Sequence, residues 1–167
     1  MPIIVQKYGG TSIGSIEKIS AVADKIISEK EKGNDIIVVV SAMSGETNRL
    51  IELAKSIDKD VNGREYDVLI STGEQVTISL LAMTLIKKGH KAISLTGQQA
   101  GITTDSIFNK ARIESIDKSK IKKHLDSGYI VIVAGFQGVT ERGDITTLGR
   151  GGSDTSAVAV SVAMDAK

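Results

Sequence analysis

The stretch Ile3-Ile4-Val5-Gln6-Lys7-Tyr8-Gly9-Gly10-Thr11-Ser12 decides how this sequence is interpreted. Its β-branched start is typical of a short buried strand. The two glycines allow a tight turn and a close approach of the backbone to a ligand. Thr11 and Ser12 offer hydroxyl groups and caps for a following helix. A lysine beside N–H groups at a helix start suits a phosphate. The alternative is an ordinary strand–helix turn with a solvated lysine.

Outward from this stretch, short apolar runs alternate with longer amphipathic runs. We expect strands at Ile3–Lys7, Asp35–Ser41, Ala92–Thr96 and Tyr129–Gly135, and helices at Ser15–Lys32, Thr47–Ile57, Gly73–Lys88, Asp117–Asp126 and Ser153–Ala166. This alternation predicts an α/β fold with a mostly parallel sheet sandwiched between helices. The segment Gly101–Ser115 is less regular. A hairpin is expected within Gly135–Gly152, because Glu141-Arg142-Gly143-Asp144 has the composition of a turn.

The composition excludes several classes of function. The chain has 167 residues, which favours one domain, and 21 basic against 20 acidic residues give a net charge of +1. This balance and the 3% aromatic content argue against a nucleic-acid partner. Cysteine is absent, which excludes disulfides and thiolate chemistry. We identify no segment with the ~20 apolar residues of a membrane span and no signal peptide, so we expect a cytoplasmic protein.

Three later turns carry further candidate residues, because ligands of open α/β sheets bind beyond the carboxyl ends of the strands. Ser41–Asn48 again places small and hydroxyl residues before a helix, where plain N-capping is the alternative. Ser71-Thr72-Gly73-Glu74 has the spacing of a capping box, which we favour over a carboxylate that binds a substrate ammonium. In Thr147–Thr155, Arg150 could clamp a carboxylate or phosphate, and Asp154 would lie in the first turn of a helix.

Other well-known motifs are absent. The sequence has neither the Gly-x-x-x-x-Gly-Lys-Ser/Thr phosphate loop nor the Gly-x-Gly-x-x-Gly dinucleotide fingerprint. Neither of its two histidines has the sequence context of a Ser-His-Asp hydrolase.

Taken together, the turns resemble those of the aspartate kinases, within the amino acid kinase family. The matching segments, in the order of that family, are Gln6–Ser12, Val40–Gly45, Ser71–Glu74, Ala100–Asp105, Ala134–Gly138 and Leu148–Asp154. One such segment would be weak support, whereas six in order are highly specific. The resemblance implies the amino acid kinase fold, which is also that of carbamate kinase. It further implies ATP-dependent phosphorylation of the side-chain carboxylate of L-aspartate to 4-phospho-L-aspartate, the first step towards lysine, threonine and methionine.

The resemblance also implies roles for individual residues. Lys7 and Asp154 would be catalytic. The residues implied at ATP and its phosphates are Lys7, Tyr8, Gly9, Gly10, Ser41 and Ser153. Those implied at the amino-acid substrate are Thr47, Asn48, Glu74, Leu125, Asp126, Arg150, Gly151, Gly152 and Ser153. The implied ligands are L-aspartate and ATP with its Mg²⁺ ion; no metal site made by the protein itself is expected.

The resemblance covers only the N-terminal portion of a kinase domain. We therefore expect residues 1–167 to be a truncated, amino-acid-binding part of a longer protein, without the rest of the nucleotide-binding lobe and without the ACT domains. We expect this part alone to have little kinase activity, and the full-length protein to be a homo-oligomer. Two alternatives remain: another small-molecule kinase of this fold, and a non-catalytic binding or assembly module.

Overall fold

The main sheet has four parallel strands in the order β1-β2-β6-β3 in the computed structural model, which describes all residues 1–167. They are β1 (Ile3–Tyr8), β2 (Asp35–Val40), β6 (Ile130–Ala134) and β3 (Ala92–Leu95). Each predicted strand is confirmed to within one residue at either end. Every residue of β2 is buried, as its unbroken apolar run indicates for a central strand of a parallel sheet.

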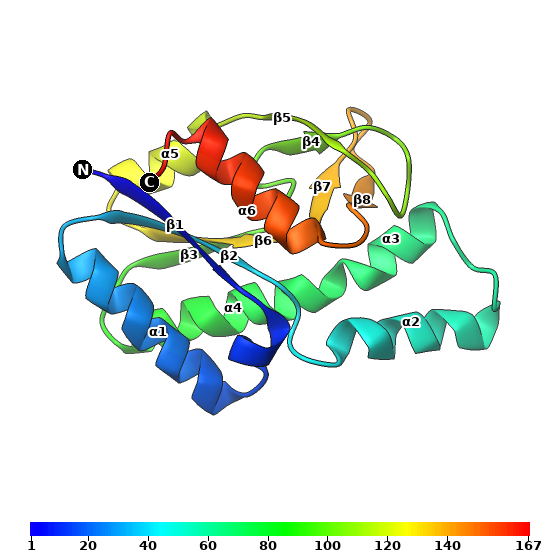
Figure 1. The fold of residues 1–167 in the computed structure, drawn as a ribbon, viewed down its shortest axis with the longest axis horizontal. Coiled ribbons are helices and arrows are strands. Elements are labelled where there is room, and N and C mark those ends of the chain that lie inside the picture. The colour runs from blue at the N-terminus through cyan, green and yellow to red at the C-terminus, as the bar shows by residue number, and fades with distance from the viewer.

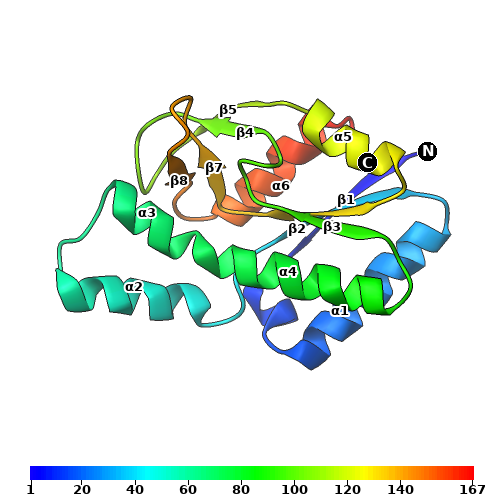
Figure 2. The same ribbon diagram turned by 180° about the vertical axis from the view of Figure 1, so that it is seen from behind.

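Helices cover both faces of this sheet (Figures 1 and 2). On one face lie α1 (Ile16–Glu31) and α4 (Thr72–Lys87); on the other lie α5 (Ser119–Asp126) and α6 (Gly152–Ala163). Alternate residues of β2 join two separate cores, since side chains of a strand point to opposite faces. Val38 belongs to the core beneath α1 and α4, and Val39 to the core beneath α5 and α6. The predicted sandwich is confirmed.

A second, mixed sheet follows the carboxyl end of β6, in the order β5-β4-β7-β8. Its strands are β4 (Ile102–Thr104), β5 (Ile113–Ile116), β7 (Gln137–Val139) and β8 (Ile145–Thr147). The antiparallel pair β7–β8 confirms the expected hairpin. Strands β4 and β5 occupy the segment that the sequence left without assignment, because runs of three or four residues carry too few positions for a clear period.

The remaining elements are the 3-10 turn η1 (Gly10–Ile13) and the helices α2 (Glu46–Ile57) and α3 (Arg64–Ile70). The sequence did not predict helix α3. It continues into α4, so that Arg64–Lys87 forms a run of 24 residues. By length and composition alone this run could cross a membrane, contrary to our interpretation of the sequence. Half of its most apolar window is buried within the fold, which is also a property of core helices in soluble proteins.

Candidate active site

Three glycine-containing turns pack against one another at the carboxyl edge of the main sheet. A Cβ atom on Gly10 would lie 3.0 Å from the carbonyl oxygen of Ala42, and one on Gly73 would lie 2.9 Å from the Ala42 Cβ. The Ser44 N–H donates to the Gly10 carbonyl at 3.2 Å. The turn after β1, the turn after β2 and the first turn of α4 therefore approach too closely for larger residues at positions 10 and 73.

A cavity of about 700 Å³ opens beside these turns. Ten of the residues implied by the family resemblance line it: Lys7, Ser41, Thr47, Asn48, Glu74, Arg150, Gly151, Gly152, Ser153 and Asp154. They come from β1, the turn after β2, α2, α4, the loop before α6 and the first turn of α6. The fold thus brings together side chains that are up to 147 positions apart in the sequence, from Lys7 to Asp154.

One side of the cavity carries an ion pair and a hydroxyl pair. The Lys7 Nζ lies 3.1 Å from Asp154 Oδ1, and both side chains are accessible to solvent. The Ser41 Oγ donates to the Ser153 Oγ at 2.9 Å, which joins the end of β2 to the first turn of α6. The positive end of the α6 dipole therefore faces the same place as the Lys7 ammonium, an arrangement suited to an anion.

Glu74 is the buried acid of the site. Its side chain is 2% exposed, and its Oε2 is the only buried side-chain nitrogen or oxygen without a hydrogen-bond partner. Burial raises the pKa of Glu74 to about 8, although the nearby Ala42 N–H and the Gln137 amide lower it in part. An unsatisfied carboxyl oxygen beside a cavity is expensive for folding, and a bound cation would satisfy it.

The favoured capping-box interpretation of Ser71–Glu74 is wrong. Ser71 is helical, its N–H donates to the Asp67 carbonyl at 3.1 Å, and its Oγ donates to the Val68 carbonyl at 3.0 Å. The helix does not begin at Ser71, because α3 already supplies the preceding turn. Glu74 therefore does not cap a helix start, and its carboxyl group is available to a ligand in the cavity.

The loop before α6 is shaped by glycines. Gly151 has a φ of 74° and precedes the helix, while a Cβ on Gly152 would lie 2.7 Å from the ring of Phe136. Phe136 itself has a φ of 73°, an uncommon value for an aromatic residue. Tight packing between this loop and the end of β6 holds Arg150 and Ser153 at the cavity.

Sequence reasoning missed several residues of the cavity wall, among them Tyr66, Asn109 and Phe136. Asn109 has a φ of 71°, and asparagine in a polar loop is a recognisable signal for such a left-handed residue. Phe136 lies within the matching segment Ala134–Gly138 but was given no role, and Tyr66 carries no comparable signal, because its position depends on how distant segments pack.

Not every implied residue reaches the cavity. Gly9 and Gly10 lie beside it, since a Cβ on Gly9 would be 3.4 Å from the Lys7 Nζ. Tyr8 does not line it: this half-buried residue packs against the core beneath α1 and α4, and its hydroxyl donates to Gln6 Oε1 at 3.1 Å.

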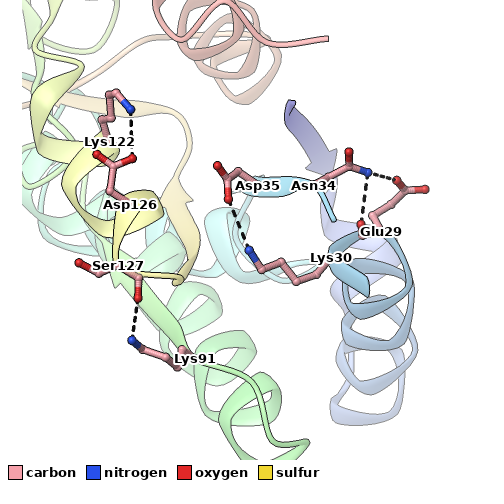
Figure 3. A network of polar contacts seen from close by, with 8 residues as sticks. All are labelled: Glu29, Lys30, Asn34, Asp35, Lys91, Lys122, Asp126 and Ser127. Carbon is pink, nitrogen blue, oxygen red and sulfur yellow. Dashed lines mark hydrogen bonds and ion pairs between the residues drawn. The ribbon is translucent and has the colours of Figure 1, made fainter. Parts of the chain in front are cut away.

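Leu125 and Asp126 do not belong to the candidate site. Leu125 is buried in the core beneath α5, and Asp126 pairs with Lys122 at 3.0 Å (Figure 3). Both stand at the end of α5, just before β6 begins, and therefore at the amino edge of the main sheet. The cavity is at the carboxyl edge, so we remove these two residues from the site.

A second hollow, of about 1050 Å³, shares Asp154 with this cavity. It is the larger of the two, and its lining includes the apolar residues Ile113, Leu148 and Val158. It has no buried titratable side chain comparable to Glu74. The smaller cavity is therefore the candidate active site. No group of three or more His, Asp or Glu side chains is placed to hold a metal ion.

Comparison with known proteins agrees with this geometry. The model of the amino acid kinase family matches residues 2–167. The aspartokinase of Geobacillus stearothermophilus is 62% identical over 167 residues, which are the whole of this chain and 41% of that protein. The chain thus spans about two fifths of the length of this curated relative.

Solved structures extend the likeness to the fold. The aspartate kinase of Synechocystis is 47% identical with a TM-score of 0.85, over 98% of this chain and 26% of that one. Aspartokinase III of Escherichia coli, solved with aspartate and ADP, is 24% identical with a TM-score of 0.87, over 98% of this chain and 47% of that one. The latter likeness is one of fold alone. With the match of the family model over nearly its whole length, this chain belongs to the amino acid kinase family.

Proposed function

We propose that this chain is the amino-acid-binding part of an aspartate kinase, which transfers the γ-phosphoryl group of ATP to the side-chain carboxylate of L-aspartate. The observation that carries the proposal is the buried, partnerless carboxyl group of Glu74 in a cavity that also presents Arg150 and Lys7. These three groups match the three charges of aspartate at neutral pH: one ammonium and two carboxylates.

Glu74 would bind the substrate ammonium. An ammonium ion satisfies the free Oε2 and compensates the buried charge, whereas a neutral ligand would do neither. Arg150 would hold the α-carboxylate through its planar pair of N–H donors. Thr47 and Asn48, at the start of α2, offer further polar contacts in the same cavity.

The side-chain carboxylate would then point towards Lys7 and Ser41. It is ionised near neutral pH and needs no general base. One of its oxygens attacks the γ-phosphorus, the bond from that phosphorus to the β–γ bridging oxygen breaks, and ADP leaves with the electron pair. Lys7 neutralises charge on the phosphoryl oxygens, and Asp154 orients Lys7 through their 3.1 Å ion pair.

ATP and Mg²⁺ complete the proposal. The resemblance implies that Gly9, Gly10 and Ser153 contact the phosphates with Lys7. A Mg²⁺ ion would come with the nucleotide and neutralise phosphate charge, and Asp154 is the accessible carboxylate nearest to Lys7 that could bind one of its waters. We also propose that the full-length protein is cytoplasmic and homo-oligomeric.

Calorimetric titration of the 167-residue chain tests the amino-acid site directly. We expect L-aspartate to bind, succinate to bind far more weakly because it lacks the ammonium, and L-glutamate to bind weakly because it is longer by one methylene. Equal binding of aspartate and succinate would rule out the role of Glu74. Preference for a different amino acid or for a nucleotide would instead favour another kinase of this fold.

The catalytic step needs a second test. Since this chain spans about two fifths of its curated relatives, we expect little ADP production from aspartate and ATP by the chain alone, and aspartate-dependent ADP production by a full-length kinase that carries it. Rapid turnover by the 167-residue chain would contradict the first expectation, and turnover that does not depend on aspartate would contradict the second.

A further inference from the structure

Asp67, on α3, is a fully buried carboxylate that none of the roles above uses. It takes part in no ion pair of the protein. Its two oxygens are instead saturated by four hydrogen bonds from only two residues. Oδ1 accepts from Asn109 Nδ2 at 2.6 Å and from Thr147 Oγ1 at 2.7 Å; Oδ2 accepts from the Asn109 N–H at 3.0 Å and the Thr147 N–H at 2.9 Å.

Such a group is costly to bury, because a carboxylate without a cation loses its hydration and regains only hydrogen bonds. A neutral side chain could fill the same space at a lower cost. The arrangement is therefore informative about what Asp67 holds together: a helix, a loop and the end of a strand that are 42 and 80 residues apart in sequence.

Both hydrogen-bond partners of Asp67 are close in sequence or in space to residues of the candidate active site. Thr147 ends β8, three residues before Arg150. Asn109 lines the cavity, and its Oδ1 accepts from the Gly63 N–H at 2.9 Å, just before α3. Gly149 lies against Asn109, since a Cβ on Gly149 would be 3.4 Å from the Asn109 carbonyl oxygen. The stem of the Arg150 loop and the Asn109 turn are thus fastened to α3 by one side chain.

The helical run that carries Asp67 also carries Glu74. The two residues are seven positions apart, which places them on the same face of a helix two turns apart. One end of this face binds the stem of the Arg150 loop, and the other end presents the carboxyl group that faces the cavity. Asp67 therefore links the helical face that carries Glu74 to the stem of the loop that carries Arg150.

We propose that Asp67 is a positioning residue that sets the spacing between Glu74 and Arg150, and thereby the fit of the site to the α-ammonium and α-carboxylate groups of an amino acid. The part of this inference that concerns the substrate groups rests on the proposed function. The part that concerns the attachment of the Arg150 loop to Asp67 does not. Asp67 touches no substrate; it acts through Thr147 and Asn109.

The neighbouring residues Thr146 and Thr147 provide a matched pair of variants. Both are fully buried on β8, and as neighbours in a strand they point to opposite faces of the sheet. Thr147 Oγ1 donates to Asp67, whereas Thr146 Oγ1 is paired with Thr104 Oγ1 at 2.6 Å. Thr147→Val and Thr146→Val each remove one buried hydroxyl group from β8, but only Thr147→Val removes a hydrogen bond to Asp67. Thr147→Ser keeps the hydroxyl and serves as the rescue.

The experiment measures hydrogen exchange of the Gly149–Gly152 amides and the dissociation constant for L-aspartate in the 167-residue chain. We expect Thr146→Val and Thr147→Val to lower the melting temperature by similar amounts. Only Thr147→Val should speed exchange of the loop and weaken aspartate binding by about tenfold, as for the loss of a hydrogen bond to a charged group. Thr147→Ser should behave like the wild type. Asp67→Asn, if it folds, should speed loop exchange and weaken aspartate binding more than Thr147→Val does.

Equal loop exchange in the two valine variants would overturn the positioning role, whether or not aspartate binds. Faster loop exchange in Thr147→Val with unchanged aspartate affinity would overturn the proposal that Asp67 sets the spacing between Glu74 and Arg150. A wild-type chain that binds no aspartate would refute the proposed function and the substrate part of this inference together, while the exchange measurement would still decide whether Asp67 holds the loop.

Discussion

The two edges of the main sheet differ in one respect: only the carboxyl edge holds a buried side-chain polar atom without a hydrogen-bond partner. At the amino edge, Lys30 pairs with Asp35 at 3.5 Å, Lys122 pairs with Asp126, and Lys91 Nζ donates to the Ser127 carbonyl at 2.7 Å (Figure 3). At the carboxyl edge, Glu74 is buried with a free oxygen. The polar groups named at the amino edge thus all have partners, whereas the carboxyl edge, despite its Lys7–Asp154 ion pair, keeps one buried carboxyl oxygen unsatisfied where a ligand is expected.

The largest effect that this comparison predicts is on catalysis. In a full-length kinase that carries this chain, Lys7→Ala should lower kcat by roughly 10²–10³-fold, because the variant removes a fixed cation from the developing phosphoryl charge. The KM for aspartate should change much less. Steady-state ADP production measures both constants, and an unchanged kcat would remove Lys7 from the mechanism.

The second effect is on substrate affinity. Glu74→Gln should weaken aspartate binding by about a hundredfold, because the buried partner of the ammonium is lost. For the wild type, burial raises the pKa of Glu74 to about 8, so the ionised form that binds the ammonium is scarce below that pH. Affinity should therefore rise by about tenfold from about pH 6.5 to about pH 8 in the wild type and stay flat in the variant. Calorimetry across this range checks both, and a flat wild-type profile would contradict the assignment.

A third effect concerns stability in the absence of substrate. Because its pKa is raised on folding, Glu74 stays protonated in the folded chain between about pH 4.5 and pH 8 but ionises in the unfolded chain. Its contribution to the free energy of unfolding should therefore be complete below about pH 4.5 and decline by on the order of 1 kcal/mol per pH unit up to about pH 8. Urea unfolding of the wild type and of Glu74→Gln at about pH 5 and about pH 8 isolates this contribution. The variant should be relatively more stable at the higher pH, and a difference independent of pH would count against the shifted pKa.

The smallest effect belongs to the amino edge. Lys122→Ala removes an exposed pair at i, i+4 spacing on α5, so we expect a loss of about 0.5 kcal/mol or less and no change in aspartate binding. Thermal unfolding and calorimetry measure the two quantities. A clear loss of aspartate affinity would show that the amino edge contributes to the site after all.

The layers of the fold and most of the site could be predicted from the sequence. The strands were recognisable because all but one residue of β2 and of β6 is β-branched, and parallel strands bring their carboxyl ends to one edge. The turns after β1 and β2 could then be assigned to a common site, because each directly follows a strand of the same parallel sheet.

What could not be predicted depends on contacts between distant segments. Helix α3 was missed because Ser71 and Glu74 imitate a helix start, and only the bond from the Ser71 N–H to the Asp67 carbonyl shows that the helix is already under way. The roles of Asp67 and Asn109 follow from pairing across 42 residues. Leu125 and Asp126 were misplaced because a motif does not tell at which edge of the sheet its residues lie.

The contact between Ala42 and Gly73 has a consequence for how such sites diverge. The two positions share one methyl-sized space, since a second Cβ would lie 2.9 Å from the first. Gly73→Ala alone should crowd the start of α4 and displace Glu74. When Gly73→Ala is combined with Ala42→Gly, the methyl group is moved from position 42 to position 73, the total volume is unchanged and Glu74 should keep its place. Among homologous chains, these two residues should therefore change together, with a glycine retained at one position whenever the other gains a side chain.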